Sequence, residues 1–149
     1  LLFEADGKYR SAWAMYETAL EKDARLIRAD LGKNRMATLL GMNIDVRGEM
    51  GRIRGKVRKD NKLLAEMHRI LSMVAEGEKE ANESILQMEM ATRRNPAEVN
   101  YWYRLARLCE MSGQRRKAVD TLETLLARDP TNAKALEEIA RIESDLGVR

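Results

Sequence analysis

The chain has 149 residues, of which 44% are hydrophobic and 34% are charged, and its net charge is +3. These values predict one packed domain, exclude a disordered chain, and fall short of the strongly basic balance of a nucleic-acid-binding domain. The single cysteine excludes an internal disulfide framework and a cysteine-rich zinc site, and the short apolar runs predict no membrane-spanning helix.

The composition favours helices along the whole chain. Only two residues are proline, 5% are aromatic, and alanine, leucine, glutamate, lysine and arginine are abundant. Turn residues divide the chain into eight predicted helices, near residues 8–23, 25–39, 43–58, 61–76, 79–94, 97–111, 115–128 and 131–146.

Glycines and capping residues mark the ends of these predicted helices. The glycines expected at turns are Gly7, Gly41, Gly77 and Gly113. The expected helix starts are Asp60-Asn61, Asn95-Pro96 and Asp129-Pro130-Thr131, since acidic or amide side chains cap helices and proline suits the first turn.

Small residues recur seven positions apart, which places both on one face of a helix. The pairs are Ala12/Ala19, Gly48/Gly55 and Ser84/Ala91. Small side chains let a paired helix approach closely, so we expect these faces to be contacts between helices. Gly48, Gly51 and Gly55 together suggest one such contact.

A second interpretation of the middle of the chain is a coiled coil. Across residues 36–74, ten of the twelve seam positions of a heptad are apolar. Gly41 and three further glycines oppose it, because each costs a helix interior about 1 kcal/mol. We favour packed hairpins, which require helix breaks near Gly41 and Asp60.

The strongest repeat signal lies between two prolines, Pro96 and Pro130, that stand 34 residues apart. The residues between them are Trp102-x2-Leu105-Ala106-x2-Cys109, Gly113 and Ala118-x3-Leu122. This pattern resembles the tetratricopeptide repeat, a helical hairpin of the same length. Ala106, Cys109 and Leu122 depart from the family pattern but keep its small or apolar character. Thirty-four residues further on, Leu136, Ile139, Ala140 and Gly147 echo it.

The resemblance implies an all-α fold, a right-handed superhelix (α-solenoid) of stacked antiparallel helix hairpins. We expect one domain over residues 1–149, divided into the end of a first repeat (1–24), a divergent repeat (25–60), a repeat (61–96), the best-matching repeat (97–130) and a C-terminal capping helix (131–149). Because the pattern begins within a repeat, we expect further repeat upstream and a bare apolar surface around Phe3, Trp13 and Tyr16.

The residues offer little for catalysis. His68 is the only histidine and lacks a readable nucleophile partner, so we expect a packing role. Cys109 occupies an aromatic core position of the family and is expected to be a small buried hydrophobe. The three glycines of residues 48–55 do not have the spacing of a phosphate-binding loop. We therefore predict no enzyme, no cofactor and no metal site.

The resemblance implies a concave groove lined by the first helix of each hairpin. The residues predicted to face it and bind a partner are Arg69, Met73, Asn100, Tyr103, Arg107, Lys134, Glu137 and Arg141. Arginines there would pair with ligand carboxylates, and Tyr103 and Met73 would add amphipathic and adaptable contacts. Heat-shock-protein-binding members of the family use a basic carboxylate clamp here; Tyr103 and Glu137 depart from it, so that clamp is not inferred.

A basic patch is the second candidate surface. Residues 47–62 carry seven basic residues against two acidic ones and no aromatic residue for stacking on bases. The basic residues are Arg47, Arg52, Arg54, Lys56, Arg58, Lys59 and Lys62. A solvated helix face explains this pattern most simply, ahead of an acidic protein partner and then of nucleic acid or membrane.

The sequence thus predicts a non-enzymatic scaffold that binds a partner protein or peptide in its groove, as part of a larger protein or assembly. The alternatives are a self-association module that forms a homo-oligomer, and a module that uses the basic patch. The compartment is not predicted.

Overall fold

The computed structural model describes residues 2–23, 25–145 and 147, and within these ranges it contains helices and no strand. The helices are α1 (Leu2–Lys22), α2 (Ile27–Leu39), α3 (Val46–Val57), α4 (Asn61–Gly77), α5 (Ala81–Arg94), α6 (Val99–Met111), α7 (Arg115–Arg128) and α8 (Ala133–Asp145). None of them is long and apolar enough to cross a lipid bilayer.

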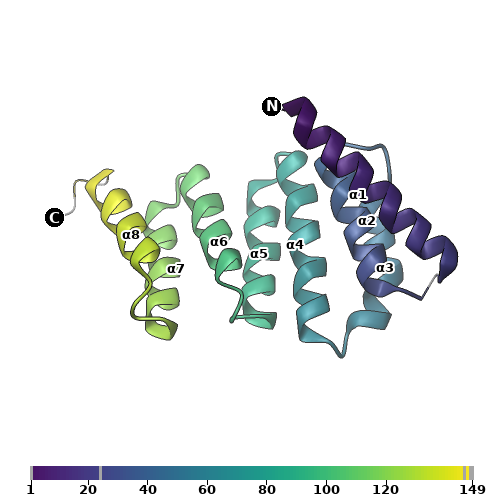
Figure 1. Cartoon of the computed structure of the whole chain (residues 1–149). Coiled ribbons are helices and arrows are strands. Elements are labelled where there is room, and N and C mark those ends of the chain that lie inside the picture. The colour runs from purple at the N-terminus through teal and green to yellow at the C-terminus, as the bar shows by residue number, and fades with distance from the viewer. Residues whose placement is uncertain (1, 24, 146, 148–149) are drawn as a thin grey trace.

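The helices stand side by side in a row, with consecutive helices running up and down (Figure 1). The most extensive contacts join α4 to α5, followed equally by α1 to α2 and α6 to α7, and the hairpins α4–α5 and α6–α7 stack through α5 on α6 and α7 on α8. The arrangement confirms the predicted all-α solenoid of stacked helix pairs. The pair α2–α3 is the looser one, because α2 contacts α1 more extensively than it contacts α3.

The core follows this stacking as two apolar clusters that both include α4. One joins α2, α3 and α4 and contains Met50, Ile53 and Ile70. The other runs from α4 to α8 and contains the predicted core residues Leu105 and Cys109. No hairpin buries its apolar face alone, so stacking on neighbours provides the core.

The first helix differs from the prediction. α1 continues through Gly7, where a turn was expected, and no other residue comes within contact of a side chain placed there. A glycine in a helix interior costs only about 1 kcal/mol relative to alanine, so it does not end a helix that packs on a neighbour. α1 packs on α2, where the Tyr16 ring lies directly over Gly32.

Two of the predicted glycine turns are confirmed. Gly41 and Gly113 both adopt positive φ, of 62° and 81°, directly after a helix. Gly77 is instead the last residue of α4, and the left-handed position two residues later belongs to Lys79, with φ of 60°. The turn is therefore in the expected place but is built without its glycine.

The predicted helix starts are partly correct. Asp60 caps α4 by accepting hydrogen bonds from the amides of Lys62 and Leu63 at 3.0 and 3.1 Å. α6 begins two residues later than predicted, capped by Glu98. α8 also begins two residues late, and Asn132 accepts the hydrogen bond from its first turn.

The coiled-coil interpretation of residues 36–74 is wrong. The helix breaks after Leu39 and again after Val57, at the two places that packed hairpins require.

The predicted close contact of three glycines is also wrong. A side chain at Gly51 or Gly55 would meet no other residue, and at Gly48 it would meet only Asp45, the cap of α3. Ser84 and Ala91, in contrast, are buried as their spacing predicted.

Candidate functional site

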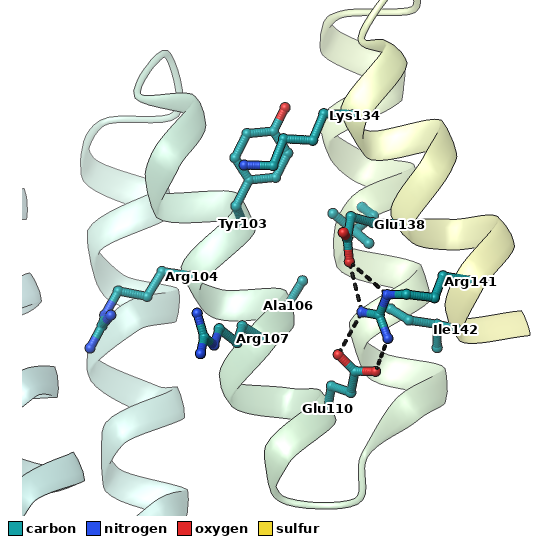
Figure 2. A pocket seen from close by; sticks show the side chains of 10 residues that line it. Tyr103, Arg104, Ala106, Arg107, Glu110, Lys134, Glu138, Arg141 and Ile142 are labelled. Carbon is teal, nitrogen blue, oxygen red and sulfur yellow. Dashed lines mark hydrogen bonds and ion pairs between the residues drawn. The ribbon is translucent and has the colours of Figure 1, made fainter. Parts of the chain in front are cut away.

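A cavity of about 400 Å³ opens between α6 and α8, over α7 (Figure 2). Both helices place one row of side chains along it at helical spacing. The lining residues are Tyr103, Arg104, Ala106, Arg107, Glu110, Leu122, Lys134, Glu138, Arg141 and Ile142.

The apolar part of this cavity is supplied by the packed core. Ala106, Leu122 and Ile142 are 4%, 1% and 1% exposed and come from α6, α7 and α8. Alanine at 106 has a small side chain, which leaves space between the two outer helices. The cavity therefore has a rigid apolar floor.

Tyr103 forms the end of the cavity nearest the start of α8. Its hydroxyl donates to Asn132 Oδ1 at 2.6 Å, and the same oxygen accepts the amide of Ala135 at 3.0 Å. The Lys134 ammonium lies 4.4 Å from the centre of the Tyr103 ring, within the range of a cation–π contact (Figure 2). The tyrosine is held in place before any ligand arrives.

Arg141, predicted to pair with a ligand carboxylate, is paired with carboxylates of the fold itself. Its guanidinium donates two hydrogen bonds to Glu110, both of 2.8 Å, and two to Glu138, of 2.7 and 3.3 Å (Figure 2). The hydrogen bonds that Arg141 donates to Glu110 and Glu138 raise the pKa of Arg141 and lower the pKa of Glu110. This pair joins α6 to α8.

Two cations of the cavity have no carboxylate partner within the described residues: Arg107 on α6 and Lys134 on α8. Both are exposed. The fourth cation, Arg104, pairs with Glu76 of α4. The cavity thus combines an apolar floor with positive charge that its own carboxylates do not neutralise.

The other residues predicted for the groove lie outside this cavity. Arg69 lies 3.7 Å from Glu66, while Asn100 and Glu137 are exposed. Met73 is only 8% exposed, so its predicted surface contact is wrong. Its position on α4 places its side chain among the buried hydrophobic residues of the fold.

Sequence reasoning missed Arg104 and Glu138 as lining residues. Glu138 replaces the predicted Glu137, one residue along α8 and hence about a quarter turn around the helix. The signal that could have identified it is the spacing of Lys134, Glu138 and Arg141, which places all three on one face of a helix.

A ladder of polar contacts connects the same face of the earlier helices. Glu66 of α4 accepts hydrogen bonds from Arg35 of α2 at 2.9 Å and from the Tyr101 hydroxyl of α6 at 3.0 Å. Burial and the nearby charge of Glu66 raise the pKa of Tyr101. These contacts fix the spacing of α2, α4 and α6.

The predicted basic patch divides into two groups. Arg47 pairs with Glu78 and Glu80 at 2.7 and 3.2 Å, and Arg52 pairs with Asp30 and Glu49 at 2.6 and 2.8 Å. These two arginines hold neighbouring helices together. The remaining five are exposed and form no ion pair with a described residue: Arg54, Lys56, Arg58, Lys59 and Lys62.

His68 and Cys109 are both buried and neither lines the cavity. His68 Nδ1 lies 2.8 Å from Gln87 Oε1, and burial is the main reason that its pKa is lowered. Burial likewise raises the pKa of the Cys109 thiol. Among the described residues there is no group of histidine, cysteine, aspartate and glutamate that could hold a metal ion.

Comparison with known proteins agrees with this architecture. Residues 99–142 match the family model of the tetratricopeptide repeat. No curated protein gives a significant match. Two solved structures, titled "Crystal structure of MamA" and "Crystal structure of MamA protein", have TM-scores of 0.68 and 0.66 at 20% sequence identity.

The two MamA matches each cover 98% of this chain, and they cover 83% and 78% of the other chains. At this identity they show a shared fold over nearly the whole chain. The repeat pattern over residues 99–142 lies on α6, α7 and α8, the helices that form the cavity. Residues 99–142 are therefore similar to a tetratricopeptide repeat, and the two MamA structures share the fold of nearly the whole chain.

Proposed function

We propose that this chain is a protein-binding scaffold and that the cavity between α6 and α8 receives a segment of a partner protein. The tetratricopeptide-repeat fold supports a role in protein interaction in general terms. The observation that carries the specific proposal is the cavity itself, in which an apolar floor lies beside two unpaired cations.

The cavity suits an apolar side chain flanked by a carboxylate. The apolar group would pack on Ala106, Leu122 and Ile142. The carboxylate would accept hydrogen bonds from Arg107 or Lys134, and Arg107 can do so with two parallel bonds. Tyr103 would offer both a ring face and a polar edge to the bound segment.

The walls are preorganised for this role. Tyr103 and Arg141 are fixed by hydrogen bonds that join α6 to α8, so little ordering is needed when a ligand binds. Rigid binding sites lose less conformational entropy on association, which favours affinity. The proposed role is non-enzymatic; the buried His68 and Cys109 lie outside the cavity.

The test is affinity capture of partners from native extract with two matched variants. Arg107→Glu reverses a cation of the cavity, and Arg116→Glu makes the same change at an exposed arginine of α7 that does not line it. We expect a partner that is captured by the wild-type chain and by Arg116→Glu but lost with Arg107→Glu. Equal capture by both variants would contradict the proposal.

A further inference from the structure

The five unpaired cations of the basic patch form a surface that we name the basic corner: Arg54, Lys56, Arg58, Lys59 and Lys62. They surround the connection between α3 and α4. By contrast, Arg35, Arg104 and Arg141 on the neighbouring face are each paired with a carboxylate. These three arginines are neutralised within the fold, whereas the five cations of the corner are not.

One acidic residue lies within the basic corner, and its carboxylate is used by the fold. Asp60 Oδ1 accepts the backbone amides of Lys62 and Leu63, which start α4. Glu98 and Asp129 have similar local roles at the starts of α6 and α8. These carboxylates face helix starts, so they leave the surrounding cations available to a ligand.

The positive charge continues along the same edge of the molecule. Figure 1 shows the α3–α4, α5–α6 and α7–α8 connections at one edge of the row of helices. Exposed Arg93 and Arg94 end α5, and exposed Arg128 ends α7.

A second cavity adjoins the basic corner. It has a volume of about 330 Å³ and lies between the first halves of α2, α4 and α6. Lys62 belongs to both the corner and the cavity, and exposed Arg28 lines the cavity without an ion pair to a described residue. The one carboxylate there, Glu66, already accepts from Arg35 and Tyr101.

We propose that the basic corner and this adjoining cavity bind an acidic polypeptide segment, a flexible chain rich in aspartate and glutamate. The surface is separate from the α6–α8 cavity, so the inference goes beyond the function proposed above. A flexible chain can run along the edge and place one of its carboxylates in the adjoining cavity. A flat bilayer or a stiff duplex that touches the corner cannot bend into this cavity.

Composition also favours a polypeptide over the other polyanions. The basic corner contains no phenylalanine, tyrosine or tryptophan that could stack on bases, and Tyr101 of the adjoining cavity is buried and donates its hydroxyl to Glu66. The large apolar side chains that are well exposed, such as Leu86 and Met111, lie outside residues 54–62, so the corner offers no apolar side chain to a lipid surface. What remains is recognition by charge, which suits a carboxylate-rich chain.

The test measures binding of a fluorescent oligoglutamate peptide to the full chain by anisotropy, at low and at raised salt. The variant Arg54→Glu with Arg58→Glu alters the corner. Arg115→Glu with Arg116→Glu makes the same change in net charge on α7. We expect the corner variant to weaken binding by about tenfold or more and the α7 variant to change it by less than about threefold.

Three further arms make the result decisive. Arg28→Glu should weaken oligoglutamate binding through the adjoining cavity. Vesicles of phosphatidylglycerol and phosphatidylcholine, and duplex DNA, should bind more weakly than oligoglutamate at the same salt. Equal losses in the corner and α7 variants, unchanged binding with Arg28→Glu, or tighter binding of vesicles or DNA would each overturn the inference. Neither the Arg28 nor the corner result bears on partner capture by the α6–α8 cavity, so the two proposals can fail separately.

Discussion

Lys79 adopts a backbone conformation that side chains other than glycine rarely take. Its φ of 60° places it in the left-handed region, where Gly41, Gly113 and Gly147 hold the comparable turn positions. A residue with a Cβ costs about 1–2 kcal/mol there. Lys79 is exposed, so no packing contact offsets this strain.

We therefore expect Lys79→Gly to raise the free energy of unfolding by about 1 kcal/mol, since it removes the strain at the cost of some unfolded-state entropy. Urea denaturation followed by circular dichroism measures the change. Gly113→Ala should have the opposite effect, because it introduces the same strain into the next turn. A Lys79→Gly chain less stable than the wild type would show that the turn is not strained.

His68 makes the fold sensitive to mild acid. Its pKa is lowered from the usual 6.5 mainly by burial, so the folded state resists protonation more than the unfolded state does. The free energy of unfolding should be constant above about pH 6.5 and should fall as the pH drops below it. Urea titrations on either side of this pH measure the loss.

The histidine faces charged groups that add to this effect. Arg54 and Arg94 lower its pKa further, whereas the hydrogen bond with Gln87, itself held by Glu83 at 2.9 Å, opposes the shift. His68→Gln removes the titrating group, and its stability should change less than that of the wild type over the same pH range. An unchanged pH dependence in this variant would assign the effect to other groups.

At the scale of helices, α1 depends on one close approach. A Cβ at Gly32 would lie 2.5 Å from Tyr16 Cζ, and none of the described side chains of α1 is fully buried. Trp13 and Lys33 add a cation–π contact of 5.4 Å, and Glu17 pairs with Lys33 at 3.0 Å. α1 is therefore held by a small number of contacts with α2.

Gly32→Ala should displace the Tyr16 ring and loosen α1 while α4 to α8 stay unaffected, since solenoid repeats contact only their neighbours. Hydrogen exchange followed by mass spectrometry should show faster exchange in α1 alone. Gly51→Ala is the matched control. Its added methyl group meets nothing, so it should stabilise α3 by up to about 1 kcal/mol. Uniformly faster exchange in Gly32→Ala would contradict this local role.

The sequence predicted the elements better than it predicted the contacts between them. Gly41, Gly113 and Asp60 carry local signals, a positive φ or a helix cap, that depend on few neighbours, and their turns and starts were predicted correctly. Gly7 and Gly51 are also glycines, but neither has a positive φ, and a Cβ at either would meet no neighbouring residue. A glycine alone does not reveal whether a neighbouring helix covers it.

The candidate site shows the same limit. Arg107 and Tyr103, both predicted to face a groove, line one cavity together, because their spacing on α6 fixes which face they share. Arg141 lines it too but is paired with Glu110, a residue 31 positions earlier in the chain. Such a pairing depends on the packing of α8 against α6, which periodicity within one helix does not describe.

Phe3 was predicted to lie on a bare apolar surface, and its side chain falls outside the described residues.

For the molecule as a whole, the arrangement of charge separates two surfaces. On the face of α2, α4, α6 and α8, Arg35, Arg104 and Arg141 pair with carboxylates of a neighbouring helix, which fixes the helix spacing. The preformed cavity at the end of this face keeps the charge of Arg107 and Lys134. The edge with the basic corner keeps its cations free. A scaffold built in this way can present two recognition surfaces on one rigid row of helices.

The most direct test of the central claim is site-specific photocrosslinking in native extract. A photoreactive amino acid replaces exposed Glu137, next to the cavity residue Glu138 on α8, or Arg116 on α7, and crosslinked proteins are identified by mass spectrometry. We predict a discrete partner crosslinked from position 137 and absent from position 116. The same products from both positions, or products from position 116 alone, would contradict a protein-binding role for the α6–α8 cavity.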